Sequence, residues 1–208
     1  MISIIDYGVG NIFNIKKCLN NIGEKFIVTN SERIINDSNI ILLPGVGSFG
    51  YASKMLRKTN LDKIIKKNVK KGKFLIGTCV GMQLLMDQSY EKGIHTGLGL
   101  ISGQVEHLKN LYSKKNEAKY PCIGYSKLNF VKNNLKIKNE TNNKCFYFVH
   151  SYYVNTNKKF IIANNKYYDK EYPAIIQKDN IIGLQFHFEI SGNSGQKLIS
   201  EIINYSKK

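Results

Sequence analysis

The chain has 208 residues, enough for one domain with a substantial core. Its 31 basic and 15 acidic residues give a formal net charge of +16, but the lysines are spread along the chain without a DNA- or RNA-binding motif, so we expect no nucleic-acid partner. Four scattered cysteines without a Cys-x-x-Cys pair, and no apolar stretch near the roughly 20 residues that span a bilayer, predict a cytoplasmic protein without disulfides, membrane attachment or a metal site.

The first half of the chain alternates strand and helix patterns. Residues 2–5 form a predicted buried strand, which is followed by a glycine-rich turn at 6–11 and by a helix that ends at Gly23. Further strands are predicted at 26–28, 39–43 and 73–78, and helices at about 49–57 and 61–71. Strands and helices that alternate at this spacing predict a mostly parallel α/β sheet with helices on both faces.

The second half lacks strong helices between its strand-like runs. These runs lie at residues 101–108, 123–131, 145–154, 160–163, 174–177 and 181–186. They predict an antiparallel extension of the C-terminal half, packed on the first sheet. A final helix at about 194–205 places four aliphatic residues on one side. No internal repeat or interdomain linker divides the chain, so residues 1–208 are expected to form a single domain.

Cys79 occupies the most informative motif, Gly77-Thr78-Cys79-Val80-Gly81, between an apolar strand and a helical pattern. Glycines two residues before and after a residue allow a sharp turn from strand to helix, which exposes a nucleophile above the sheet. The positive end of the helix is expected to stabilise a thiolate. A lone cysteine beside a strand is more commonly a small core residue, but neither core packing nor a regular strand favours these flanking glycines. We therefore interpret Cys79 as a nucleophile.

The downstream segment Gln185-Phe186-His187-Phe188-Glu189 supplies the partners that a cysteine nucleophile needs. In an extended strand, residues two apart share a face, so Glu189 is expected to orient His187 while His187 faces the sulfur. A histidine near the last strand is also commonly a structural residue. Its combination with the glycine-flanked cysteine favours a Cys-His-Glu hydrolase.

These two motifs resemble those of the class I, or triad, glutamine amidotransferases, which hydrolyse glutamine to glutamate and ammonia through a γ-glutamyl thioester. Four further segments are similar to the glutaminase subunits of imidazole glycerol phosphate synthases, enzymes of histidine biosynthesis: residues 5–11, 43–49, 97–100 and 147–152. The resemblance implies a flavodoxin-like α/β fold and no cofactor. It also implies a heterodimer with a cyclase or synthase subunit, a (β/α)8 barrel, that receives the ammonia.

The resemblance further implies roles for individual residues. Cys79 would attack the amide carbon of glutamine, His187 would carry the proton, and Glu189 would orient His187. Backbone N–H groups at three positions would hold the oxyanion: Val46, Gly47 and Val80. Four residues are expected to bind the substrate: Gly45, Gln83, Ser151 and Tyr152. Four are expected at the partner interface: Asn11, Tyr125, Tyr147 and Ile190. His150 is expected to have a structural or positioning role and not to act as a second base.

Two segments depart from the pattern of the family. The chain has Phe188-Glu189-Ile190-Ser191 where the family has Pro-Glu-Lys-Ser, and residues 122–126 read Cys-Ile-Gly-Tyr-Ser where it has His-Ile-Gly-Trp-Asn. The predicted catalytic residues are intact, so hydrolysis is expected to survive while the partner is in question. Two alternatives to a histidine-pathway subunit are a paralogous glutaminase that supplies ammonia to a synthase of amidino surface sugars, and a non-catalytic binding subunit that retains the fold.

Overall fold

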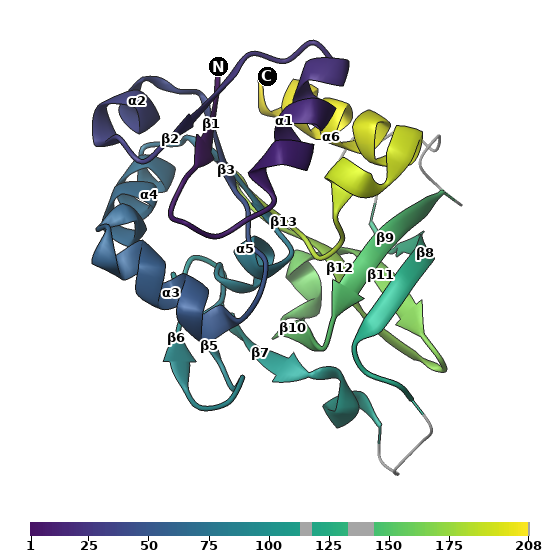
Figure 1. Ribbon diagram of the computed structural model, residues 1–208. Coiled ribbons are helices and arrows are strands. Elements are labelled where there is room, and N and C mark those ends of the chain that lie inside the picture. The colour runs from purple at the N-terminus through teal and green to yellow at the C-terminus, as the bar shows by residue number, and fades with distance from the viewer. Residues whose placement is uncertain (113–117, 133–143, 208) are drawn as a thin grey trace.

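The computed structural model describes residues 1–112, 118–132 and 144–207. Its first half alternates strands and helices as predicted (Figure 1). The elements are β1 (Ile2–Ile5), α1 (Ile12–Asn21), β2 (Phe26–Thr29), α2 (Glu32–Asp37), β3 (Ile40–Leu43), α3 (Phe49–Lys58), α4 (Leu61–Lys70), β4 (Phe74–Thr78) and α5 (Val80–Gln83). The six-residue α2 was not predicted. The helix after Cys79 is shorter than expected, because α5 has only four residues.

The second half is mainly strands. They are β5 (Gln88–Ser89), β6 (His95–Thr96), β7 (Gly103–His107), β8 (Cys122–Phe130), β9 (Cys145–His150), β10 (Tyr152–Thr156), β11 (Ile161–Tyr167), β12 (Lys170–Lys178) and β13 (Ile181–Leu184), before the last helix α6 (Gly192–Ser206). The single strand predicted at 145–154 is wrong, because the chain breaks at Ser151. Three 3-10 helices complete the described elements: Leu108–Leu111, Lys158–Phe160 and Phe188–Ile190.

Nine strands form one mixed sheet in the order β2-β1-β3-β4-β13-β12-β11-β8-β9. The strands from β2 to β13 are parallel, and those from β12 to β9 are antiparallel. Most of the predicted antiparallel extension therefore continues the edge of the parallel sheet, but β7 and β10 pack on one of its faces, where Val105 and Val154 join the same core as Ile41 and Leu43. A second, smaller sheet has the order β10-β7-β5-β6, so the break at Ser151 carries the chain from one sheet to the other.

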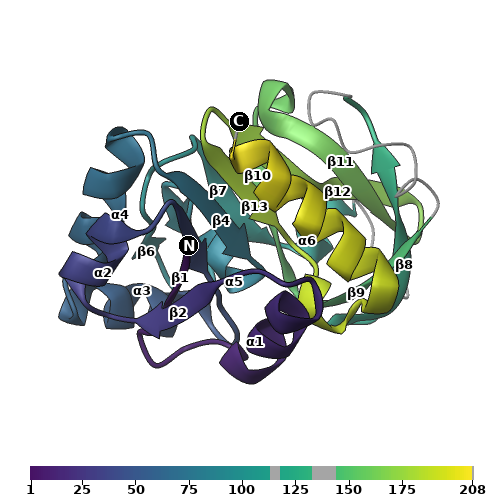
Figure 2. The same cartoon turned by 90° about the horizontal axis from the view of Figure 1, so that it is seen from above.

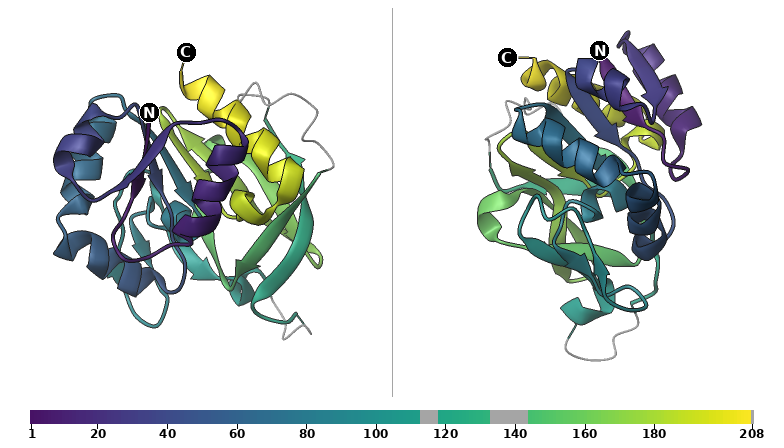
Figure 3. Two further views of the ribbon diagram at one scale, coloured as in Figure 1. Left: turned by 45° about the horizontal axis from the view of Figure 1, so that its top comes forward. Right: turned by 90° about the vertical axis from the view of Figure 1, so that its left-hand side faces the viewer.

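Two hydrophobic cores cover the two faces of the large sheet. Successive side chains of a strand point to opposite faces, so Ile40 and Leu42 of β3 join a core with α1 and α6, while Ile41 and Leu43 join one with α3 and α4. Helices α1 and α6 lie side by side on the first face (Figures 1 and 2). Both termini lie at the same end of the molecule (Figure 3). Among the described helices, none is long and apolar enough to cross a membrane.

Candidate active site

A cavity of about 460 Å³ lies where the parallel strands end. The turns that follow β1, β3, β4 and β13 all reach it, because the carboxyl ends of parallel strands meet at one edge of a sheet. Ten of the residues predicted for the site line it: Asn11, Val46, Gly47, Cys79, Val80, Gln83, Ser151, Tyr152, His187 and Ile190. Motifs more than a hundred residues apart are thus brought together. Within the described residues, no group of His, Cys, Asp or Glu side chains could hold a metal ion.

Cys79 lies in a strained turn between β4 and α5. Its φ of 52° and ψ of −114° are unusual for a residue with a side chain. A Cβ at Gly77 would lie 2.6 Å from Gly81 O, and one at Gly81 would lie 2.0 Å from Leu43 O, so this turn requires both glycines. However, α5 is a single turn, so its dipole can contribute little of the predicted stabilisation of a thiolate.

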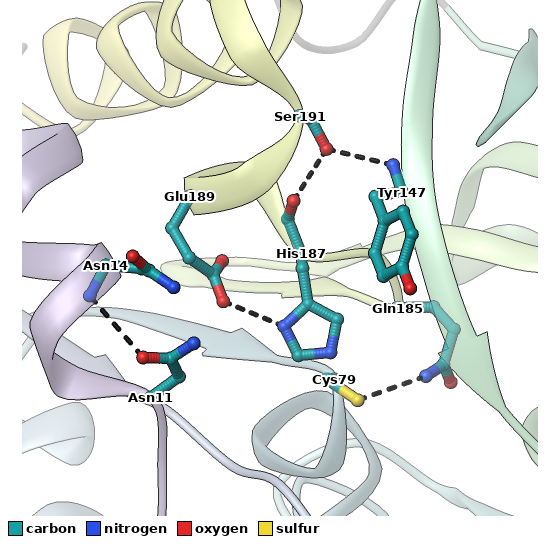
Figure 4. A network of polar contacts seen from close by, with 8 residues as sticks. All are labelled: Asn11, Asn14, Cys79, Tyr147, Gln185, His187, Glu189 and Ser191. Atoms are coloured by element: carbon teal, nitrogen blue, oxygen red, sulfur yellow. Dashed lines mark hydrogen bonds and ion pairs between the residues drawn. The ribbon is translucent and has the colours of Figure 1, made fainter. Parts of the chain in front are cut away.

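His187 and Glu189 form a buried pair, with 2.8 Å between Nδ1 and Oε1 (Figure 4). The expected strand geometry is wrong here, because residues 188–190 form a 3-10 helix and the turn brings Glu189 back to the ring. Burial by itself would lower the pKa of His187, but hydrogen bonds to Cys79 and Glu189 raise it to about 10. The imidazole is therefore held protonated beside the sulfur.

Ser191 fixes the position of this turn. Its hydroxyl donates to His187 O at 2.6 Å and accepts from Tyr147 N at 2.9 Å. His187 N also donates to Tyr147 O at 2.9 Å, which ties the turn to β9. Figure 4 shows Ser191 between His187 and Tyr147. Because both ends of the His187 backbone are bound, its ring has a defined direction toward Cys79.

Val46, Gly47 and Val80 line the cavity that contains Cys79. Their backbone N–H groups have no acceptor among the described residues. Gly45 allows the segment with Val46 and Gly47 to lie close to the turn after Cys79, since a Cβ at position 45 would lie 2.5 Å from Gly81 N. Gly47 has a φ of +83° in open space. The geometry leaves these donors free for an oxygen that carries negative charge.

Gln83 and Glu91 bring polar groups to the cavity wall. Gln83 is buried, and its Nε2 donates to Tyr152 O at 3.0 Å. Glu91, which the sequence analysis missed, accepts a hydrogen bond from Phe49 N on Oε2 at 2.6 Å. It lies in a short turn without any motif, so no sequence signal identified it. Its carboxylate suits a positively charged group of a ligand.

His150 lies in the cavity wall but already uses both ring nitrogens. Nδ1 is 2.9 Å from Tyr152 O, and Nε2 is 3.0 Å from the Tyr172 hydroxyl. Burial lowers the pKa of His150 to about 4, so the ring is neutral. It therefore has no nitrogen free to act on a substrate.

Three of the four predicted interface residues meet at the mouth of the cavity. Tyr125 and Tyr147 face each other across β8 and β9, with 5.3 Å between ring centroids, and the Tyr125 hydroxyl donates to Ile190 O at 3.1 Å. Alternation along an extended segment would turn Ile190 away from a site that Glu189 faces, but Ile190 lines the cavity, because residues 188–190 form a 3-10 helix. Asn11 lines the cavity from the N-terminus of α1.

Comparisons with known proteins identify the family of the chain. Residues 3–204 match the family model described as glutamine amidotransferase class-I. A Geobacillus sp. protein named imidazole glycerol phosphate synthase subunit HisH is 39% identical over 199 residues, which cover 96% of this chain and 94% of the relative. A Caldanaerobacter subterraneus protein of that name is 40% identical over 199 residues, with 96% and 95% covered. A solved structure described as a glutamine amidotransferase has a TM-score of 0.75 at 16% identity, with 100% and 99% covered.

Proposed function

The chain belongs to the class-I glutamine amidotransferase family, and we infer that it is the glutaminase subunit of imidazole glycerol phosphate synthase. It hydrolyses glutamine to glutamate and ammonia. The observation that carries the chemistry is the position of His187 in the same cavity as Cys79, with Glu189 Oε1 2.8 Å from His187 Nδ1. We propose that residues 1–208 act as one domain in this reaction.

In the proposed mechanism, Cys79 attacks the amide carbon of glutamine as a thiolate. His187 gives its proton to the leaving ammonia and then takes one from the water that hydrolyses the thioester, while Glu189 holds the ring in place. The N–H groups of Val80 and of the Val46–Gly47 segment hold the oxyanion in both steps. Loss of one such donor typically costs about 2.7–4 kcal/mol of barrier.

The rest of the cavity supports recognition of the amino-acid end of glutamine. Glu91 supplies a negative charge for the α-ammonium group, and the Ser151–Tyr152 backbone, held by Gln83, is assigned to the α-carboxylate. These contacts place the side-chain amide toward Cys79. Binding by both ends orients the substrate for attack.

We propose that the synthase partner is a (β/α)8-barrel cyclase that covers the cavity mouth. The mouth is bordered by apolar side chains from two adjacent strands, which pair as Ile123 with Val149 and Tyr125 with Tyr147; Tyr147 is half-buried and the other three are exposed. Such a continuous patch beside a cavity is typical of an interface. A partner here would receive ammonia directly. We also propose a cytoplasmic location, since the four cysteines are free thiols.

Ile190 and Tyr125, which differ from the family pattern, both lie at this mouth. This observation favours a second candidate function. A paralogous glutaminase for an amidino-sugar synthase would keep the catalytic residues and change this face. The catalytic cavity is common to both candidates, so only the identity of the synthase differs between them.

The test is an assay of glutamate release by the purified chain, alone and with the histidine-pathway cyclase subunit of its own organism. We expect hydrolysis of glutamine and, with the cyclase and its substrate, glutamine-dependent synthesis of imidazole glycerol phosphate. Hydrolysis without synthesis would favour the sugar pathway. No hydrolysis in either mixture would reject the enzyme and leave the non-catalytic binding subunit.

A further inference from the structure

Gln185 contacts the nucleophile directly, although the proposed mechanism gives it no role. Its side chain is fully buried, and its Nε2 lies 4.0 Å from Cys79 Sγ. Figure 4 shows the side chains of Gln185 and His187 both directed at Cys79. Gln185 and His187 both follow β13, with one residue between them. The end of this single strand therefore places two side chains beside the sulfur.

The orientation of the Gln185 amide is fixed by its neighbours. Gln83 Nε2 lies 3.0 Å from Tyr152 O and 3.2 Å from Gln185 Oε1. A backbone carbonyl can only accept a hydrogen bond, so the amino end of Gln83 must face Tyr152. The same amino group then requires an acceptor on Gln185. Gln185 therefore presents Oε1 to Gln83 and its N–H group to Cys79.

The carbonyl oxygen of Tyr152 also fixes the direction of the hydrogen bonds of His150. His150 Nδ1 lies 2.9 Å from Tyr152 O and must carry the proton, so Nε2 accepts from the Tyr172 hydroxyl at 3.0 Å. Because Tyr152 O can only accept from His150 and from Gln83, neither the His150 ring nor the Gln83 amide can flip. Buried polar groups whose bonds are fixed in direction in this way hold one arrangement.

An N–H group directed at sulfur stabilises the thiolate more than the thiol. We propose that Gln185 is a catalytic residue that donates an N–H group to the Cys79 thiolate, and that Tyr152 O sets its direction through Gln83. This donor supplies what the single turn of α5 does not. The inference rests on the proposed function only in taking Cys79 as the nucleophile.

The sulfur has other titratable neighbours, and the test leaves all of them unchanged. They lie in the turns after β1, β13 and β5 and at the ends of β9 and β10: Tyr7, His187, Glu189, Glu91, His150 and Tyr152. A change that follows substitution of Gln185 alone is therefore attributable to its amide.

The experiment measures the rate of Cys79 alkylation by iodoacetamide from pH 5 to 10. It is read by peptide mass spectrometry, because the exposed Cys145 will react as well. Two variants are compared, Gln185→Met, which removes the donor at similar length, and Gln185→Glu, which replaces it with an acid of the same shape. We expect the midpoint of the pH profile to rise by about one unit in Gln185→Met, and further in Gln185→Glu. Unchanged midpoints in both folded variants would overturn the proposal.

A matched control is Gln177→Met on β12, whose Nε2 lies 3.4 Å from the Tyr205 hydroxyl, away from the cavity. It should keep the wild-type profile. If the Gln185 variants do not fold, the side-chain amide resonance of Gln185 in the ¹⁵N-labelled wild-type chain gives the answer. It should shift when methyl methanethiosulfonate blocks Cys79, and an unmoved resonance would overturn the proposal. The alkylation assay needs no glutamine. If the wild-type chain failed to hydrolyse glutamine while the pH midpoints of alkylation rose as expected in the Gln185 variants, only the proposed function would be rejected.

Discussion

Glu189 Oε1 lies 2.8 Å from His187 Nδ1 because the chain between them turns through a 3-10 helix. One intervening residue thus suffices to place a carboxylate on the side of the ring opposite Cys79. Both side chains are almost fully buried, so their interaction is weakly screened by solvent. The protonation state of His187 depends on this contact and on the sulfur.

Replacing Glu189 by glutamine should therefore slow glutamine hydrolysis by roughly 10²–10⁴-fold, the usual range for a disturbed general acid–base. Without the carboxylate, the pKa of His187 falls from about 10. The alkaline limb of the kcat profile, where His187 loses its proton, should move to lower pH. Steady-state kinetics across pH measure both effects. Glu171→Gln, at an exposed position on β12, is the control. An unmoved alkaline limb would mean that Glu189 does not set the charge of His187.

The nucleophile can be tested by removing each thiol in turn. Cys79→Ala should abolish hydrolysis, because no other group can form the thioester. Cys18→Ala, Cys122→Ala and Cys145→Ala should remain active, since none of these thiols lines the cavity. An electrophilic glutamine analogue should label Cys79 alone in mass spectrometry. Labelling at Cys122, or full activity of Cys79→Ala, would remove Cys79 from the mechanism.

The sequence was informative where local rules decide the structure. The alternating first half, the antiparallel extension and the turn at Cys79 all follow from spacing and from glycines that sterics require. It misled where apolar residues alternate without forming a strand: Phe186 and Phe188 are both buried, yet the chain leaves β13 at Leu184 and turns. Glu91 could not be found, because its place depends on a contact with Phe49, 42 residues earlier in the chain.

His150 should make the protein sensitive to acid. Its pKa is lowered to about 4 in the folded chain by burial, whereas an unfolded histidine titrates near 6.5. Between these values only the unfolded state binds the proton, so the free energy of unfolding falls as pH decreases from 6.5 to 4. The loss is on the order of 3 kcal/mol at full shift.

Urea unfolding at several pH values measures this loss. The variant His150→Gln keeps polar atoms at the site but does not titrate, so its stability should vary less between pH 6.5 and 4. His95→Gln, at a partly exposed histidine on β6, should behave like the wild type. Equal acid sensitivity in His150→Gln and the wild type would show that another group is responsible.

Gly45 offers a test of the oxyanion segment. An added Cβ would lie 2.5 Å from Gly81 N and 2.8 Å from Val80 Cβ, so Gly45→Ala must displace the segment that carries Val46 and Gly47. We expect kcat to fall by about 10²–10³-fold, as for a lost oxyanion donor. Gly23→Ala, where a Cβ meets nothing within 4 Å but a φ of +74° strains an alanine, controls for a general loss of stability, because Gly23 does not line the cavity. If Gly45→Ala retained its kcat, the donors would lie elsewhere.

The last prediction concerns the choice of partner. A lysine at position 190, as in the family pattern, can form an ion pair across the interface, and an isoleucine cannot. A charged partner group buried without its counterpart costs about 2–5 kcal/mol, enough to weaken binding by tens to thousands of fold. Tyr125, which donates to Ile190 O, offers less ring area than a tryptophan at the same place. This chain should therefore bind a cyclase from an ordinary histidine pathway weakly.

Calorimetry with that cyclase should give a higher affinity for Ile190→Lys than for the wild-type chain. Val131→Lys adds the same charge at another exposed apolar position, beyond the end of β8, and should not improve binding. The comparison separates a specific ion pair from the general effect of one more positive charge on an already basic protein. Tight binding of the wild-type chain that Ile190→Lys does not improve would mean that position 190 does not select the partner.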